Sequence, residues 1–244
     1  MPEPYLSIVV PAYNEQARIG ATLRKIQCYA AAQPFGVEVI VVDDGSTDET
    51  TELAARSPGV RILRVVPNRG KGHAVRHGAL AAAGKFLLFT DADLSAPIEE
   101  ADRLFAALES SGADAAIGSR ALRRELIGVR QPILRDYSGR CYNLLVQLFT
   151  GLRIHDTQCG FKLFRMEAAL TRRAFELQRV EGFGFDPELL FLIERLGGKI
   201  VEVPVRWNHS PASKVRFPRD PIRMFADLIS LRVRAIGNKY SQPR

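Results

Sequence analysis

Five short hydrophobic segments recur through the first half of this 244-residue chain, and this spacing constrains the fold more than any other feature. They are rich in Val, Ile, Leu and Phe, are bounded by Pro, Gly, Asn or Asp, and cover residues 6–10, 37–42, 60–65, 85–90 and 114–118. Helical patterns separate them, and one is expected to begin at a capping box formed by Ser46 and Glu49. This alternation predicts an α/β fold with a mainly parallel, doubly wound sheet and helices on both faces.

The second half is less regular, with a basic stretch at 120–140, an expected helix that ends near 149 and an expected strand at 199–207. Between residues 223 and 236, helical spacing puts one apolar set on a common side: Met224, Leu228, Leu231, Ala235 and Ile236. We interpret this segment as an amphipathic helix packed on the core, and a helix on a membrane surface is the alternative. No repeat or linker divides the chain, so we expect a single domain spanning residues 1–244.

Composition narrows the classes of function. No apolar run reaches the roughly 18 residues of a membrane span, and no signal peptide precedes the first strand, so we expect a cytoplasmic protein. Residues 1–119 carry 11 Lys and Arg against 15 Asp and Glu (net −4), whereas residues 120–244 carry 23 against 12 (net +11). This asymmetry suggests that one half handles a metal and the other an anion. The basic residues show no nucleic-acid-binding motif, and we expect no nucleic acid partner.

Polar loops follow four of the expected strands, and the carboxyl ends of parallel strands share one edge of a sheet. At the first, Pro11 ends the strand, Tyr13 offers a flat face for a base and Glu15 offers an acceptor. Asp43 and Asp44 follow the second strand and suit the N–H of a base or the hydroxyls of ribose. In the third loop, residues 68–72, glycines allow close backbone approach and Lys71 supplies positive charge, although the spacing excludes a P-loop.

The fourth loop holds Asp91, Ala92 and Asp93 directly after the strand at 85–90. Two carboxylates at the mouth of an apolar core require a compensating cation or polar ligand. Mg²⁺ or Mn²⁺ is commonly held by one or two carboxylates together with substrate phosphate oxygens. We therefore expect Asp93 to reach a metal and Asp91 to touch the metal or ribose.

The ordered series of motifs resembles the inverting family 2 glycosyltransferases of GT-A fold, and within them the dolichyl-phosphate glucosyltransferase and polyprenyl-phosphate sugar synthase branch. The resemblance spans roughly residues 5–216 and adds the Gly-Ser-Arg motif ending at Arg120 and the segment 156–162. It implies a GT-A fold in which residues 1–119 bind the nucleotide sugar and residues 120–244 bind the acceptor. The residues that it implies for the nucleotide sugar are Pro11, Ala12, Tyr13, Glu15, Asp43, Asp44, Lys71, Asp91 and Ala92.

For the reacting centre, the resemblance implies Asp156 together with the metal and diphosphate ligands Asp93 and Asp91. Arginine forks suit phosphate, so the basic stretch and the later segment 213–216 are interpreted as the acceptor site, with Arg120, Arg135, Lys214 and Arg216 as its residues. A phosphate monoester is already largely ionised near pH 7, its second pKa being about 6, so Asp156 would then position the acceptor. With a hydroxyl acceptor, Asp156 would act as a general base.

The sequence hypothesis is metal-dependent transfer of a sugar, with inversion, from UDP-glucose to a polyprenyl or dolichyl phosphate. Three alternatives stay open: a GDP-mannose-dependent enzyme of the same kind, a soluble glycosyltransferase with a hydroxyl acceptor, and a nucleotidyltransferase that would release pyrophosphate. A sensor that binds donor without turnover is disfavoured by the intact acidic residues. For a lipid acceptor, we expect peripheral contact with the cytoplasmic membrane face.

Overall fold

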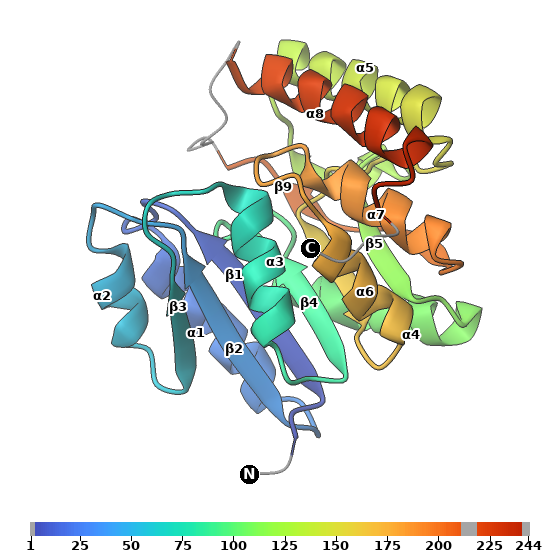
Figure 1. Cartoon of the computed structure of the whole chain (residues 1–244). Helices are drawn as coiled ribbons and strands as arrows, with labels where there is room; N and C mark the ends of the chain where they lie inside the picture. Colours follow the sequence, from blue (N-terminus) through green and yellow to red (C-terminus); the bar gives the residue numbers. More distant parts are fainter. Residues whose placement is uncertain (1–2, 211–218, 241–244) are drawn as a thin grey trace.

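A seven-stranded mixed sheet forms the centre of the computed structural model, which describes residues 3–210 and 219–240 (Figure 1). Its spatial order is β3-β2-β1-β4-β7-β5-β8. The strands are β1 (Leu6–Ala12), β2 (Val37–Asp43), β3 (Val60–Arg64), β4 (Phe86–Thr90), β5 (Ala115–Ser119), β7 (Phe161–Arg165) and β8 (Ile200–Pro204). Only β7 runs antiparallel to its neighbours, β4 and β5. The predicted mainly parallel α/β sheet is confirmed, and β5 and β8 join the same sheet as β1 to β4.

Helices cover both faces of the sheet, because the strand residues alternate between two separate hydrophobic clusters. Ile8 and Val10 of β1 pack with α1 (Ile19–Ala31) and α4 (Ala101–Ser111), whereas Val9 packs with helices on the other face. These other helices are α3 (Lys71–Ala81), α6 (Ala169–Leu177) and α7 (Phe185–Arg195). The expected doubly wound arrangement follows from this alternation.

Two long helices, α5 (Ile133–Thr150) and α8 (Arg219–Ile236), lie side by side beyond α7 (Figure 1). A third cluster joins them to the sheet through Val146 of α5, Leu190 of α7 and Leu228 of α8. Beside them, the short strand β6 (Ile127–Val129) pairs with β9 (Trp207–Asn208). Within the described residues, each helix is too short or too polar to cross a bilayer.

Three local predictions are wrong. The expected capping box does not start a helix: α2 (Thr50–Ala55) begins at Thr50, and the Ser46 hydroxyl instead accepts the amide of Asn14 at 2.9 Å. The expected strand at 199–207 is interrupted, since β8 ends at Pro204 and β9 pairs with a different strand. In α8, the first four predicted apolar residues are buried, but Ile236 is exposed.

Candidate active site

The four polar loops converge, because β3, β2, β1 and β4 are neighbours in the sheet and run parallel. Pro11 and Ala12 are the buried last residues of β1, and Tyr13 follows them half-buried at the sheet edge. The amide of Asp44 donates to the carbonyl of Ala12 at 2.9 Å, which ties the second loop to the first. The predicted nucleotide-binding residues thus lie along one edge.

Asp43 and Asp44 organise the backbone of the loops in which they lie. Asp43 is fully buried and accepts the Ser46 amide at 3.0 Å and the Thr51 hydroxyl at 2.7 Å. Asp44 accepts the backbone amides of Arg69 and Gly70 and the side-chain amide of Asn68, at 2.6–3.0 Å. These bonds satisfy both carboxylates without ligand and fix the loop before α3. Contact of either residue with a nucleoside stays a prediction.

Asp91 is held between a lysine and a glycine. The Lys71 ammonium lies 2.6 Å from Asp91 Oδ1, at the start of α3, and the Asp91 amide donates to the Gly160 carbonyl at 3.1 Å. A Cβ atom on residue 160 would lie 1.9 Å from Asp91 Oδ2, so a larger residue there would displace the Asp91 carboxylate. Burial opposes the charge of Lys71, but Asp91 outweighs it and raises the pKa of Lys71. Lys71, which was predicted to supply charge for a phosphate, and Asp91, the first carboxylate of the fourth loop, therefore form an ion pair.

Asp93 has a different environment. Its Oδ1 accepts the Ser95 amide at 2.9 Å, and its Oδ2 lies 3.9 Å from the Arg18 guanidinium. Ser95 in turn accepts the amide of Asn208, which brings β9 to this loop. The donor set fits a divalent cation that completes its shell with diphosphate oxygens, because both carboxylates are partly exposed and oxygen-only ligands suit Mg²⁺ and Mn²⁺. Among the described residues, no group of three or more His, Cys, Asp and Glu side chains forms a metal cage by itself.

Asp156 is buried and forms an ion pair with the partly exposed Arg120. Arg120 donates to Asp156 from its backbone amide at 2.9 Å and from Nε and Nη2 at 2.7 Å each, and its guanidinium lies over the Trp207 ring. Burial opposes ionisation of Asp156, but the charge and hydrogen bonds of Arg120 outweigh it and hold the pKa of Asp156 below its ordinary value. Glu202 accepts the Asp156 amide at 2.8 Å and fixes this segment. Asp156 is thus an anion that orients an arginine.

A pocket of about 160 Å³ opens beside this pair. Its lining includes Asp156 and Trp207 and four arginines: Arg120, Arg124, Arg130 and Arg140. Arg124 and Arg140 share Asp136 at 2.9 and 3.0 Å, which leaves the pocket with excess positive charge. Of the other predicted acceptor residues, Arg135 lies in the first turn of α5, where desolvation and the charge of Arg120 lower its pKa. Lys214 and Arg216 lie outside the described residues.

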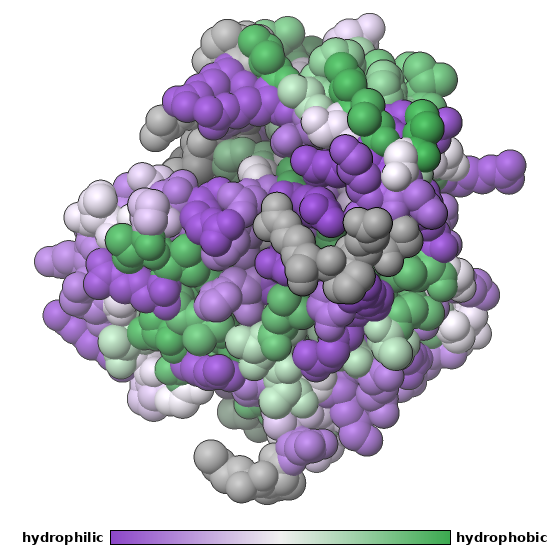
Figure 2. All heavy atoms as spheres, viewed as in Figure 1, coloured by the Kyte–Doolittle hydropathy of each residue, from purple (hydrophilic) through white to green (hydrophobic). Residues whose placement is uncertain are grey.

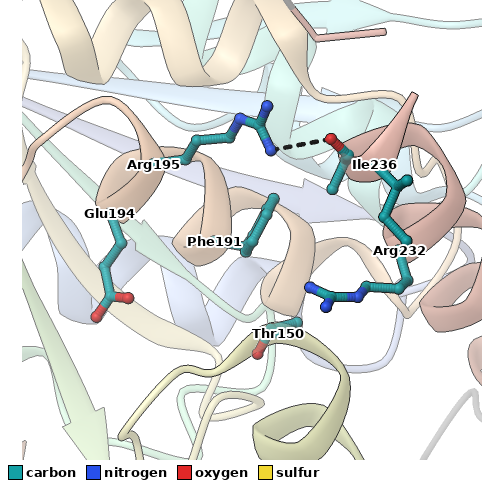
Figure 3. Close-up of a pocket in the computed structure, with 7 residues that line it drawn as sticks. Thr150, Phe191, Glu194, Arg195, Arg232 and Ile236 are labelled. Atoms are coloured by element: carbon teal, nitrogen blue, oxygen red, sulfur yellow. Dashed lines mark hydrogen bonds between the residues drawn. The ribbon is translucent and has the colours of Figure 1, made fainter. Parts of the chain in front are cut away.

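A second cavity, of about 350 Å³, lies away from the carboxylate edge, between the last turns of α5, α7 and α8 (Figure 3). Phe191 stands at its centre with Arg195 and Arg232 on either side, and Arg195 donates to the Ala235 carbonyl at 3.2 Å. None of the site residues predicted from the sequence lines it. We therefore take the sheet edge and the arginine pocket as the candidate active site.

Sequence reasoning missed three groups that shape the site. Arg18 bonds Glu15 and reaches Asp93, the buried Lys162 pairs with Asp186 at 2.5 Å, and Trp207 lies under Arg120. The partners of Arg18 at 93 and of Lys162 at 186 are distant in sequence, so no local pattern reveals them. The sequence could have indicated Lys162 alone, because it is a charged residue within the short apolar run of β7, and a charge buried in a strand requires a partner.

The fold and the site are those of an α/β enzyme whose polar loops meet at the carboxyl edge of the sheet. Residues 7–171 match the model of Glycosyl transferase family 2, and the chain belongs to this family of glycosyltransferases. It is 40% identical to a dolichyl-phosphate beta-glucosyltransferase of Drosophila melanogaster over 96% of this chain and 76% of that protein. The Saccharomyces cerevisiae protein of the same name is 36% identical over 95% and 75%.

Solved structures show the same GT-A fold. Glucosyl-3-phosphoglycerate synthase from Mycobacterium tuberculosis, in complex with Mn²⁺, uridine diphosphate and glucosyl-3-phosphoglycerate, superposes with a TM-score of 0.66 at 25% identity. The match covers 93% of this chain and 78% of that one. The predicted family and GT-A fold are confirmed.

Proposed function

We propose that this glycosyltransferase moves glucose, with inversion, from UDP-glucose to the phosphate of a polyprenol such as dolichyl phosphate. The observation that carries the proposal is the arginine-lined pocket. It lies beside the sheet edge that holds Asp91 and Asp93, and the strands of the second half of the chain belong to the same sheet. It is supported by relatives named dolichyl-phosphate beta-glucosyltransferase along nearly the whole chain, and by a neighbour solved with Mn²⁺ and a uridine nucleotide.

On the donor side, Tyr13 and the loop fixed by Asp43 and Asp44 would receive the nucleoside. Asp93 and Asp91 would hold Mg²⁺ or Mn²⁺, which when bound neutralises charge on the departing diphosphate. The Lys71 ammonium lies 2.6 Å from Asp91 and would add positive charge beside the same phosphate. The donor site thus combines carboxylates for the metal with a cation for the leaving group.

On the acceptor side, Arg120 presents a guanidinium that Asp156 and Trp207 orient. A phosphate oxygen is already anionic near neutral pH and attacks without a base, since its second pKa is about 6. Asp156 would then act through Arg120, because both of its oxygens are already bonded to that residue. A hydroxyl acceptor would need a base with a pKa nearer to 7.

The test is to incubate the purified chain with UDP-glucose, GDP-mannose and Mn²⁺ or Mg²⁺, with either a short polyprenyl phosphate or 3-phosphoglycerate as acceptor. We expect UDP release coupled to a glucosylated polyprenyl phosphate. Turnover only with the soluble acceptor would replace the lipid proposal, and turnover only with GDP-mannose would replace the donor. Release of pyrophosphate from UTP and glucose 1-phosphate would make the chain a nucleotidyltransferase.

A polyprenyl phosphate presents its head group at a membrane surface, and we infer that the chain meets this surface peripherally on the cytoplasmic face. The support is the net positive charge of residues 120–244, which contain the arginine pocket. Retention of an intact, tag-free chain in the membrane fraction of its cells, released by high salt, is the expected result. Complete recovery in the supernatant at low salt would contradict it.

A further inference from the structure

Helix α5 carries an apolar stripe that no described residue covers. Ile133, Leu134, Tyr137, Cys141, Leu144 and Leu148 repeat at helical spacing, and all six are exposed. The stripe is a separate face of the helix from Asn143 and Val146, which are buried against the protein. Ile133 is 88% exposed and Leu148 is 78% exposed, so the stripe runs from the first turn of α5 to the last.

Helix α8 has a second apolar stripe besides the one that it buries. Met224, Leu228, Leu231 and Ala235 face the core, whereas a set offset by about one third of a turn is exposed: Ile222, Phe225, Ile229, Val233 and Ile236. The two helices pack together, and the Phe149 and Phe225 rings meet edge to face with centroids 6.1 Å apart. Figure 2 shows hydrophobic side chains gathered over α5 and α8 at the top of the molecule. Contiguous exposed apolar patches commonly mark interaction sites.

The charges beside the exposed stripes of α5 and α8 indicate which kind of partner binds there. Arg219, Arg223 and Arg232 on α8 are exposed and flank the stripes, and so does Arg140 on α5, which pairs with Asp136 at 3.0 Å. A hydrophobic stripe with arginine flanks matches the interface of an anionic bilayer, where acyl chains meet phosphate head groups. The arginine pocket continues this face, since Ile133 and Arg140 line the pocket and also belong to the surface of α5.

We propose that the exposed stripes of α5 and α8 together form a docking face for an anionic lipid bilayer, with the arginine pocket opening at its rim. The identification of the pocket as the acceptor site rests on the proposed function, whereas docking itself does not require turnover. In this orientation, a lipid phosphate reaches Arg120 from the bilayer without leaving the interface.

The test is co-sedimentation of the purified chain with vesicles of phosphatidylcholine, with and without about one third phosphatidylglycerol. We expect binding to the anionic vesicles, weakened by salt, and a loss of about tenfold or more in Leu148→Glu and Ile229→Glu. Val66→Glu is the matched control, because Val66 is 70% exposed but follows β3 at the far edge of the sheet. The proposal is overturned if the α5 and α8 variants bind vesicles as tightly as the wild type does. It is also overturned if the wild type is a dimer without vesicles and both variants are monomers.

Turnover of a short, water-soluble polyprenyl phosphate separates this proposal from the proposed function. The glutamate variants should retain this turnover, because Leu148 and Ile229 lie outside the pocket lining. If the wild type binds vesicles but turns over no lipid phosphate, the docking face stands and the acceptor assignment falls.

An independent observation concerns Arg18, at the N-terminus of α1. Its guanidinium donates to Glu15 Oε1 at 2.9 Å and to the Ser210 hydroxyl at 2.8 Å, and it lies 3.9 Å from Asp93 Oδ2. Burial opposes its charge, but the hydrogen bond and charge of Glu15 outweigh this and raise the pKa of Arg18. One side chain therefore joins the first loop, the carboxylate loop and the segment after β9.

We infer that Arg18 is a positioning residue that sets Asp93 and Glu15 for the metal–nucleotide complex. Calorimetric titration of UDP with Mn²⁺ is the test. Arg18→Gln should weaken UDP binding about tenfold, and Arg18→Lys, which keeps charge but loses the planar fork, should weaken it less. Lys25→Gln, an exposed cation on the same helix, is the control. UDP binding by Arg18→Gln equal to wild type overturns the inference.

Discussion

At the scale of single residues, Asp156 tests whether the reaction uses a general base. Because Arg120 lowers the pKa of Asp156, the carboxylate is ionised throughout the range in which the enzyme can be assayed, and its stabilising pair is lost only as the pH falls through this lowered pKa. We expect the pH profile of kcat with a lipid phosphate acceptor to have the same shape in the wild type and in Asp156→Asn between about pH 5.5 and 8. The variant should be slower at every pH, by about tenfold to a hundredfold, because Arg120 loses its partner.

The pH profiles of wild type and Asp156→Asn, measured with the same acceptor, check this expectation. Arg120→Lys provides the comparison, since lysine keeps the charge but lacks the paired donors that Asp156 accepts. Both variants should lose rate in a similar way. An acid limb near neutral pH that only Asp156→Asn removes would show that Asp156 is a base.

Gly160 is the residue on which the position of Asp91 depends. In Gly160→Ala the new Cβ would meet Asp91 Oδ2 at 1.9 Å, so the carboxylate must move away from Lys71 or the β7 segment must shift. We expect KM for UDP-glucose to rise about tenfold or more, since a displacement of about 1 Å at a reacting site can cost a hundredfold. Gly20→Ala, where the nearest atom is the end of the Arg24 side chain at 3.7 Å, is the matched control. An unchanged KM in Gly160→Ala would remove Asp91 from the donor site.

At the scale of elements, a buried ion pair fixes the antiparallel strand β7 to helix α7. The Lys162 ammonium is fully buried and bonds Asp186 and the Cys159 carbonyl, both at 2.5 Å. Burial raises the pKa of Asp186 in spite of the Lys162 and Lys71 charges. In Lys162→Met the carboxylate stays buried without its partner, and we expect a loss of about 3–5 kcal/mol in the free energy of unfolding at pH 7.

Chemical denaturation of Lys162→Met and of Lys162→Met/Asp186→Leu measures this loss. The double variant should be more stable than the single one, because it leaves no unpaired buried charge. The deficit of the single variant should also shrink as the pH falls, since protonation of an Asp with a raised pKa removes the charge. Equal stability of wild type and Lys162→Met would contradict the role of the pair.

The elements also show what the sequence could predict. Strands β1 to β4 were predicted because each is a short apolar run bounded by Pro, Gly, Asp or Asn, and the loops that follow them were predicted to meet because parallel strands share an edge. β7 was not foreseen as an antiparallel strand, since its direction depends on pairing with β4 and β5 rather than on local pattern. The exposed stripe of α5 was missed because its Leu and Tyr residues are typical of a buried face.

At the scale of the whole molecule, the charge asymmetry of the sequence corresponds to the two sides of the site. The proposed donor edge gathers carboxylates from the first 119 residues, and the proposed acceptor pocket gathers arginines from the basic second half. The ordered motifs identified the family, but the bonds within the site depend on contacts distant in sequence, such as Arg120 with Asp156 and Arg18 with Asp93. Residue types thus predicted the kind of reaction, whereas contacts between distant residues decide which side chains of the site face a ligand.

Ligand binding should stabilise the whole fold, because the proposed donor site is built from loops of four sheet strands and exists only in the folded chain. A ligand at a hundred times its Kd adds about 2.7 kcal/mol to the free energy of unfolding. We expect UDP with Mn²⁺ to raise the melting temperature by about 5 °C, and UDP with a chelator to raise it much less. Asp93→Ala should abolish the Mn²⁺-dependent part while melting near the wild type without ligand, since Asp93 is partly exposed. Glu176→Ala, an exposed carboxylate on α6, should respond as the wild type does. A full Mn²⁺-dependent shift in Asp93→Ala would mean that other oxygens hold the metal.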